Sequence, residues 1–265
     1  MTPAEKKLFL LDMDGTLYLD DLLFDGVTDF LAAVKAKGGR YLFLTNNSSR
    51  GAEDYVAKLR RLGIAATVED FLTSVDATIA VLKREFPGAR CYVSGTASFR
   101  RQLSEAGINV TDTLDDTIDV LLSGFDRELT FQKLEDSCIL LNRGIPWLAT
   151  NPDWVCPTAY GYVPDCGSVC DMLRRATGRE ARFLGKPQPD MVSLALEKTG
   201  FAPEEAVMVG DRLYTDIACG VNAGIDTVFV LSGEGTRQDI DQMQIHPTWV
   251  LNNIAELYHM MEDNA

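Results

Sequence analysis

The stretch Leu8-Phe9-Leu10-Leu11-Asp12-Met13-Asp14-Gly15-Thr16 is the most informative part of this chain. Its four leading apolar residues predict a buried strand. Asp12 and Asp14 follow directly, and side chains two residues apart leave a strand on the same face. Two like charges held close together repel unless a cation lies between them or one takes a proton. The stretch therefore predicts either a Mg²⁺ site with a reactive carboxylate or an acidic turn, for which Asp and Gly are also common residues.

Strand-like and helix-like segments alternate outward from this stretch. The strand over 8–12 leads to a helix near 26–37, and a strand over 41–44 leads to a helix from 51 to 62. This order predicts a parallel sheet with helices on both faces, which is a Rossmann-like α/β fold class. The pattern continues with strands at 90–93, 119–122, 147–150, 206–209 and 227–231, and helices near 97–106, 130–143, 189–199 and 214–222. A mean sheet has only about 5–6 strands, so two α/β modules are expected.

The composition is that of a soluble globular protein. The chain has 265 residues, of which 46% are hydrophobic and 24% charged, and its formal net charge is −14. That charge argues against a surface for nucleic acid or for an anionic membrane. The two histidines, His246 and His259, lie near the C-terminus. Acid–base chemistry is therefore expected to fall to carboxylates.

No segment predicts a membrane span or a signal peptide. No apolar run approaches the roughly 20 residues needed to cross a bilayer, and Asp12 interrupts the apolar run near the N-terminus. The six cysteines form no Cys-x-x-Cys pair, and Cys166 and Cys170 lie four apart without a partner motif. Reduced thiols in a cytoplasmic protein are therefore expected, with no zinc site.

Three further polar clusters follow predicted strands, where the sites of α/β proteins usually form. The cluster from Thr45 to Ser48 could hold an anion at a helix N-terminus or form a plain N-cap. Lys186 lies in a loop with two prolines and could place a point charge on a phosphate, or lie in solvent as most lysines do. Asp211 could complete an oxygen-ligand Mg²⁺ site. Asp216 could support that site or only complement a helix dipole.

The order of these clusters resembles the four motifs of the haloacid dehalogenase superfamily of phosphatases. Asp12 to Thr16 match the first motif, Thr45-Asn46 the second, Lys186 the third, and Gly210-Asp211 through Asp216 the fourth. The resemblance covers essentially the whole chain, and no motif position departs from the pattern.

Two other segments resemble the NagD-like and p-nitrophenylphosphatase-like branch of that superfamily. They are Gly124 to Arg127 and Thr150 to Asp153. This branch carries a large α/β cap between its second and third motifs, which accounts for the excess of strands. The resemblance implies a catalytic core made of residues 1–77 and 182–265, with an inserted α/β cap domain over 78–181.

The resemblance also implies a role for each motif residue. Asp12 would be the nucleophile that forms an aspartyl-phosphate, since an ionised carboxylate needs no base. Asp14 would protonate the leaving oxygen and later deprotonate water. Mg²⁺ would be held by Asp12, the backbone carbonyl of Asp14 and Asp211, and Asp216 would support these ligands from behind. The phosphoryl oxygens would be held by Thr45, Asn46 and Lys186.

The cap is expected to read the leaving group of the substrate, and residues 151–168 are the candidates for its reading surface. Asn151, Asp153 and Ser168 are polar residues in this stretch, among glycines and prolines that predict a loop-rich segment. They could equally form a turn and the first turn of a helix. Elsewhere, Gly233-Glu234-Gly235 lacks the third glycine of a dinucleotide-binding fingerprint and is interpreted as a loop.

The resemblance implies Mg²⁺-dependent hydrolysis of small phosphate monoesters, such as nucleoside monophosphates or sugar phosphates. Two alternatives stay open: a phosphotransferase or mutase that passes the phosphoryl group to an alcohol, and a non-catalytic binding protein on this fold. A dehalogenase is disfavoured because it needs neither Mg²⁺ nor a second acidic residue. The expected partner is a small phosphorylated metabolite, and the sequence does not distinguish a monomer from a homodimer.

Overall fold

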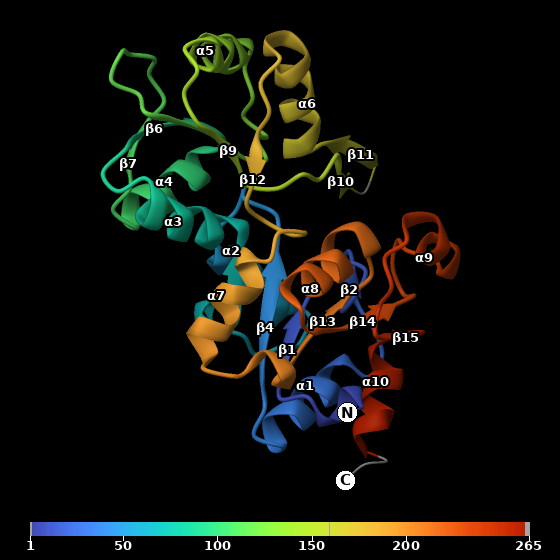
Figure 1. Cartoon of the computed structure of the whole chain (residues 1–265). Helices are drawn as coiled ribbons and strands as arrows, with labels where there is room; N and C mark the ends of the chain where they lie inside the picture. The colour runs from blue at the N-terminus through green and yellow to red at the C-terminus, as the bar shows by residue number, and fades with distance from the viewer. Residues whose placement is uncertain (1, 159, 263–265) are drawn as a thin grey trace. The chain divides into compact units, whose positions relative to one another are not determined.

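A computed structural model of the chain describes residues 2–158 and 160–262 (Figure 1). The chain divides into two compact units. The first comprises Met1–Thr45, Ala52–Leu72 and Lys186–Ala265, and the second comprises Asn46–Gly51 and Thr73–Gly185. The sequence predicts a core of residues 1–77 and 182–265 with a cap inserted over 78–181. That division, and the role of the insert as a cap, stay predictions.

The first unit is built on a parallel sheet. Among the described residues this sheet has six strands in the order β15-β14-β13-β1-β4-β5, and the pairs from β15 to β4 are parallel. An antiparallel hairpin, β2–β3, follows β1. The strands are β1 (Leu8–Leu11), β2 (Tyr18–Leu19), β3 (Leu22–Leu23), β4 (Arg40–Thr45), β5 (Phe71–Thr73), β13 (Ala206–Gly210), β14 (Asp226–Val230) and β15 (Trp249–Leu251).

Helices cover this sheet, so its central strands are buried. All four residues of β1 are inaccessible to solvent, as expected of a parallel strand with both faces covered. Helices α1 and α10 lie side by side (Figure 1), and Phe30 of α1 packs edge-on against Phe9 with 5.2 Å between ring centroids. The helices are α1 (Val27–Ala36), α2 (Ala52–Arg61), α7 (Asp190–Thr199), α8 (Ala218–Ala223), α9 (Arg237–Met243) and α10 (Ile254–Glu262), with short turns η1 (Pro3–Glu5), η2 (Val68–Asp70), η3 (Pro203–Glu205) and η4 (Leu213–Ile217).

The second unit has a parallel sheet of its own. In the part of the chain that the structure describes, this sheet has five strands in the order β12-β9-β8-β6-β7. Its strands are β6 (Arg90–Ser94), β7 (Asn109–Thr111), β8 (Val120–Ser123), β9 (Trp147–Ala149) and β12 (Arg182–Phe183). Its helices are α3 (Ser74–Glu85), α4 (Ala97–Glu105), α5 (Phe131–Asn142) and α6 (Cys166–Thr177). The predicted α/β class with a parallel sheet is therefore confirmed.

Most predicted elements end within one or two residues of the observed ones, but two differences have a physical cause. The stretch predicted to be loop-rich contains an antiparallel hairpin, β10 (Val155–Thr158) and β11 (Gly161–Pro164). Gly161 has a φ of +120°, which only glycine adopts without strain, so the glycine that suggested a loop closes a hairpin instead. The helix predicted near 214–222 begins as a π-helical turn over Leu213–Ile217, and such turns often occur at functional sites.

The expectations about membrane spans and about the cysteines can be compared with the structure. Among the described residues, no helix is both long enough and apolar enough to cross a membrane. The six cysteines all lie within the described ranges, and none of them forms a disulfide. The sulfur atoms of Cys166 and Cys170 are 3.9 Å apart on one face of α6, with no third metal ligand grouped with them in the described chain.

Candidate active site

The carboxyl ends of three neighbouring strands bring the core motifs together. β13, β1 and β4 are adjacent, with Leu11 in register with Val209 and with Phe43. Asp12 continues this ladder, because its backbone N–H donates to the Val209 carbonyl at 2.9 Å. Asp211 follows β13 directly, and Thr45 is the last residue of β4. Parallel strands end at one edge of a sheet, so side chains far apart in sequence meet there.

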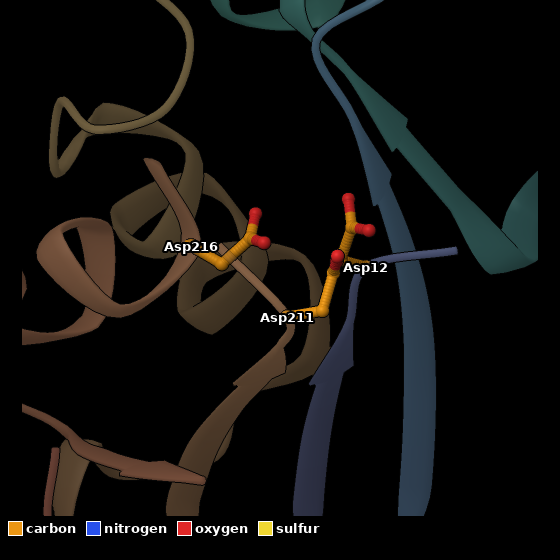
Figure 2. Close-up of side chains that lie close together, drawn as sticks. All are labelled: Asp12, Asp211 and Asp216. Carbon is orange, nitrogen blue, oxygen red and sulfur yellow. The ribbon is translucent and has the colours of Figure 1, made fainter. Parts of the chain in front are cut away.

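Three carboxylates gather at this edge, from Asp12, Asp211 and Asp216 (Figure 2). Each offers an oxygen within 4.8 Å of the others, an arrangement that could hold a metal ion. Carboxylate oxygens are the donors that Mg²⁺ prefers. The residues present therefore fit a hard divalent cation.

Lys186 supplies positive charge inside the same cluster. Its Nζ lies 2.6 Å from Asp12 Oδ1 and 2.7 Å from Asp216 Oδ1, and it donates to the Leu44 carbonyl at 3.3 Å. The side chain is only 2% exposed. Burial by itself lowers the pKa of Lys186, but Asp12 and Asp216 more than reverse this, so that the pKa lies above its ordinary value. The ammonium group therefore stays charged.

One lysine does not neutralise the three carboxylates, of which Asp211 and Asp216 are buried and Asp12 is partly buried. Burial and the Asp216 charge raise the pKa of Asp12 well above its usual range, although Lys186 opposes them. The same two causes raise the pKa of Asp211 to about 6. Both shifts mean that the ionised site carries more negative charge than its surroundings stabilise. A bound divalent cation would remove that excess.

We therefore expect Asp211→Asn to stabilise the metal-free protein at pH 7.5. In the wild type, the Asp211 carboxylate accepts from the Glu234 N–H and from the Thr16 hydroxyl. Asn keeps both contacts available, because its Oδ1 can accept from the Glu234 N–H and its Nδ2 can donate to the Thr16 hydroxyl oxygen. A carboxyl whose folded pKa is raised is stabilising below its unfolded pKa, and this contribution is lost as pH rises through the folded pKa. For Asp211 that window runs from 3.8 to about 6. The variant should gain roughly 1–3 kcal/mol above this window and little below it.

Urea unfolding of both proteins with EDTA between pH 4 and pH 8 measures this effect. A gain that grows toward pH 4 would contradict the assignment, because the Asp211 carboxyl of the folded wild type is then protonated and adds no charge to the site.

Asp211 is held by a loop that the sequence did not connect to the site. Its Oδ1 accepts from the Thr16 hydroxyl at 3.2 Å, and its Oδ2 accepts from the backbone N–H of Glu234 at 2.8 Å. A Cβ on Gly15 or Gly233 would come within 2.4 or 2.0 Å of Asp211 Oδ2. Only glycine leaves room for the carboxylate at either position. The Gly233–Gly235 segment is indeed a loop, and it packs against Asp211.

Asp216 projects from the π-helical turn η4. Its Oδ2 accepts from the backbone N–H of Arg212 at 3.1 Å, while Oδ1 contacts Lys186. A Cβ on Gly210 would lie 2.3 Å from the Asp216 Cβ, so that glycine allows the turn to approach the end of β13. Asp216 thus both bonds a backbone N–H at the start of its turn and contacts the buried lysine.

The remaining first-unit residues of the predicted site lie around this cluster. Thr45 is mostly buried at the end of β4. The Asp14 side chain is 52% exposed and contacts Lys58 and Tyr18, two residues that the sequence did not single out. No sequence signal marked Lys58, since it lies on α2 among other basic residues.

Asn46 and the three cap candidates belong to the second unit. Asn46 and Asn151 each donate to Asp153 Oδ2 at 2.8 Å, and Asn151 also donates to Asp165 Oδ1 at 3.1 Å. All four side chains are buried. Ser168 lies in the first turn of α6 and donates to the Trp154 carbonyl. The structure thus joins Asn46, Asn151 and Asp153 in one network with Asp165, which the sequence did not indicate, and leaves Ser168 outside it.

Comparison with known proteins identifies the family. A haloacid dehalogenase-like hydrolase family matches residues 9–109, and a second HAD-hydrolase-like family matches residues 183–257. The acid sugar phosphatase of Staphylococcus aureus strain MRSA252 is 33% identical over 256 residues, which are 97% of this chain and 98% of that protein.

Solved structures with similar folds include two proteins named as phosphatases. The 4-nitrophenylphosphatase of Thermotoga maritima is 40% identical with a TM-score of 0.91, and the match covers 98% of each chain. NagD of E. coli is 33% identical with a TM-score of 0.86, over 95% of this chain and 98% of NagD. The glycerol phosphate phosphatase of Mycobacterium tuberculosis, solved with calcium, is 31% identical with a TM-score of 0.90, over 97% of this chain and 76% of that one.

These matches extend over nearly the whole chain and agree with the cluster of carboxylates at the sheet edge. The chain belongs to the haloacid dehalogenase-like hydrolases, in their NagD-like branch, and it is a phosphatase.

Proposed function

We propose that this phosphatase hydrolyses small phosphate monoesters with Mg²⁺, through an aspartyl-phosphate on Asp12. The observation that carries the proposal is the group of Asp12, Asp211 and Asp216 with the buried Lys186. It combines a nucleophile with a cation-binding donor set and a fixed positive charge. Mg²⁺, held by Asp12, the Asp14 carbonyl and Asp211, would neutralise charge between the nucleophile and the phosphate.

The first step is transfer of the phosphoryl group to the protein. A carboxylate oxygen of Asp12 attacks phosphorus, the ester P–O bond breaks, and the leaving oxygen takes a proton from Asp14. The phosphoryl oxygens are held by Thr45, Asn46 and Lys186 while charge redistributes. Water then attacks phosphorus and gives its proton to Asp14. The bond between Asp12 and phosphorus breaks, which releases inorganic phosphate and restores both carboxyl groups.

Sugar phosphates and related polyol phosphates are the proposed substrates, with aryl phosphates as artificial ones. The names of the relatives support this choice: acid sugar phosphatase, glycerol phosphate phosphatase and 4-nitrophenylphosphatase. We further propose that the second unit serves as the cap, with Asn151, Asp153 and Ser168 near the leaving group. The six cysteines, none of which forms a disulfide, support a cytoplasmic location.

The test is phosphate release from a panel of sugar phosphates, glycerol phosphate, nucleoside monophosphates and 4-nitrophenyl phosphate. We expect phosphate release with Mg²⁺ and loss of release with EDTA. As the control, EDTA that has been saturated with Mg²⁺, with further Mg²⁺ added, should allow full release. Phosphate release that persists without metal would refute the proposed requirement for Mg²⁺. If an added alcohol becomes phosphorylated in preference to water, the phosphotransferase alternative replaces hydrolysis.

A further inference from the structure

We propose that Lys58 and Tyr18 are positioning residues that hold the Asp14 carboxyl group where it can transfer a proton. The inference rests on the proposed function, in which Asp14 is the acid and base. All three residues lie in the first unit, on α2, on β2 and in the loop after β1 respectively. None of the four family motifs includes Lys58.

The two neighbours contact different oxygens of Asp14. Lys58 Nζ lies 3.3 Å from Oδ1, and the Tyr18 hydroxyl donates to Oδ2 at 3.4 Å. An aspartate side chain with 52% of its surface exposed can otherwise rotate among several rotamers. A contact at each oxygen restricts both the position of the carboxyl group and the orientation of its plane.

Tyr18 is itself rigidly placed. It is fully buried, and its carbonyl accepts from the Gly15 N–H at 2.8 Å, which folds the loop back so that Asp14 bridges to Tyr18. Burial and the neighbouring Asp14 charge raise the pKa of Tyr18 above its ordinary value. The hydroxyl therefore keeps the proton that it donates.

Lys58 is more than a mobile surface lysine. Its Nζ lies 3.9 Å from the centroid of the Tyr18 ring, a cation–π geometry, and its side chain is only 21% exposed. An isolated surface ion pair contributes little. Here the ring fixes the ammonium group, and the ammonium group and hydroxyl together fix the carboxyl group.

This arrangement matters for leaving groups that need a proton. A proton donor must lie within hydrogen-bond reach of the oxygen it protonates. Phenolate is a poor leaving group and gains from protonation, whereas 4-nitrophenolate leaves unprotonated because the nitro group stabilises its charge. Loss of positioning should therefore slow cleavage of phenyl phosphate far more than cleavage of 4-nitrophenyl phosphate, although the two esters are nearly the same shape.

The experiment compares kcat/KM for these two esters in Lys58→Met, Lys58→Arg and Tyr18→Phe. kcat/KM covers the steps through transfer to Asp12, so later hydrolysis does not affect it. We expect Lys58→Met to lower the phenyl phosphate value about tenfold and the 4-nitrophenyl phosphate value less than about twofold. Lys58→Arg should keep most of the wild-type kcat/KM for phenyl phosphate. Tyr18→Phe should lower kcat/KM for phenyl phosphate about threefold and leave the value for 4-nitrophenyl phosphate unchanged.

Lys35→Met is the matched control, because Lys35 Nζ also lies over a tyrosine ring, 4.8 Å from the centroid of Tyr41. It should change neither value. Equal losses for both esters in Lys58→Met would indicate a merely structural role and overturn the inference. Faster cleavage of phenyl phosphate would also overturn it, since contact with Lys58 would then hinder proton transfer from Asp14 instead of assisting it.

Asp14→Asn separates this inference from the proposed function. It should lower the phenyl phosphate value roughly 10²-fold or more, with a much smaller loss for 4-nitrophenyl phosphate. If Asp14→Asn shows no dependence on the leaving group, the role of Asp14 in the proposed function fails. If Asp14→Asn shows it and Lys58→Met does not, only the inference about Lys58 and Tyr18 fails.

Discussion

Asp12→Asn should reduce phosphate release on the order of 10⁴-fold or more, because an amide oxygen is a far weaker nucleophile than a carboxylate. The fold should survive the change. Asn keeps an oxygen to accept from Lys186, and the backbone N–H that bonds Val209 is unaltered. The variant also removes one of three mutually repelling charges, so its free energy of unfolding in EDTA should not fall. The measurement is 4-nitrophenolate release under saturating Mg²⁺.

Asp226→Asn is the control for this prediction. Asp226 forms a 2.6 Å ion pair with the buried Lys6, at the start of β14 and thus at the opposite end of the same sheet from the site. It should lose stability but keep activity. Wild-type turnover in Asp12→Asn would show that Asp12 is not the nucleophile. In the wild-type protein, mass spectrometry of the trapped intermediate should show a phosphoryl group on Asp12.

Lys186→Met should destabilise the metal-free protein by about 3–5 kcal/mol, because removing one partner of a buried ion pair leaves charge uncompensated. Met matches the length of the lysine stem, so the loss reflects charge more than packing. Asp12 and Asp216 would then face each other without the ammonium group that lies 2.6 and 2.7 Å from them. Activity should fall as well, since the positive charge on the phosphoryl oxygens is lost.

Urea unfolding in EDTA measures the stability loss, and a double-mutant cycle with Asp216→Asn tests its origin. The double variant should be more stable than Lys186→Met alone, because one of the unpaired carboxylates is gone. Lys6→Met provides a matched buried lysine with similar exposure. It should also lose stability but retain full kcat. Equal stability of Lys186→Met and wild type would contradict the charge balance described for the site.

Strands and helices could be predicted wherever the local pattern of apolar residues indicates which residues are buried. The apolar run at Leu8 to Leu11 is buried on both faces, and Asp12 ends it, so sequence and structure agree there to one residue. The stretch after Asn151 was harder, because glycine and proline mark loops and hairpin ends alike. The β10–β11 hairpin there depends on cross-strand pairing, which no local pattern reports.

The same distinction applies to the site. The sequence alone determined the fold class, the family and the grouping of Asp12 with Asp211, because residues that follow parallel strands meet at one sheet edge. The folded structure was needed to show that Lys186 lies buried between Asp12 and Asp216. It was also needed to show that the Glu234 N–H donates to Asp211 and that Lys58 and Tyr18 contact Asp14. The physical reason is that periodicity reports which face of an element is buried. Which distant side chains then touch is set by the order of the strands and by the close approach that glycines at the loop positions allow.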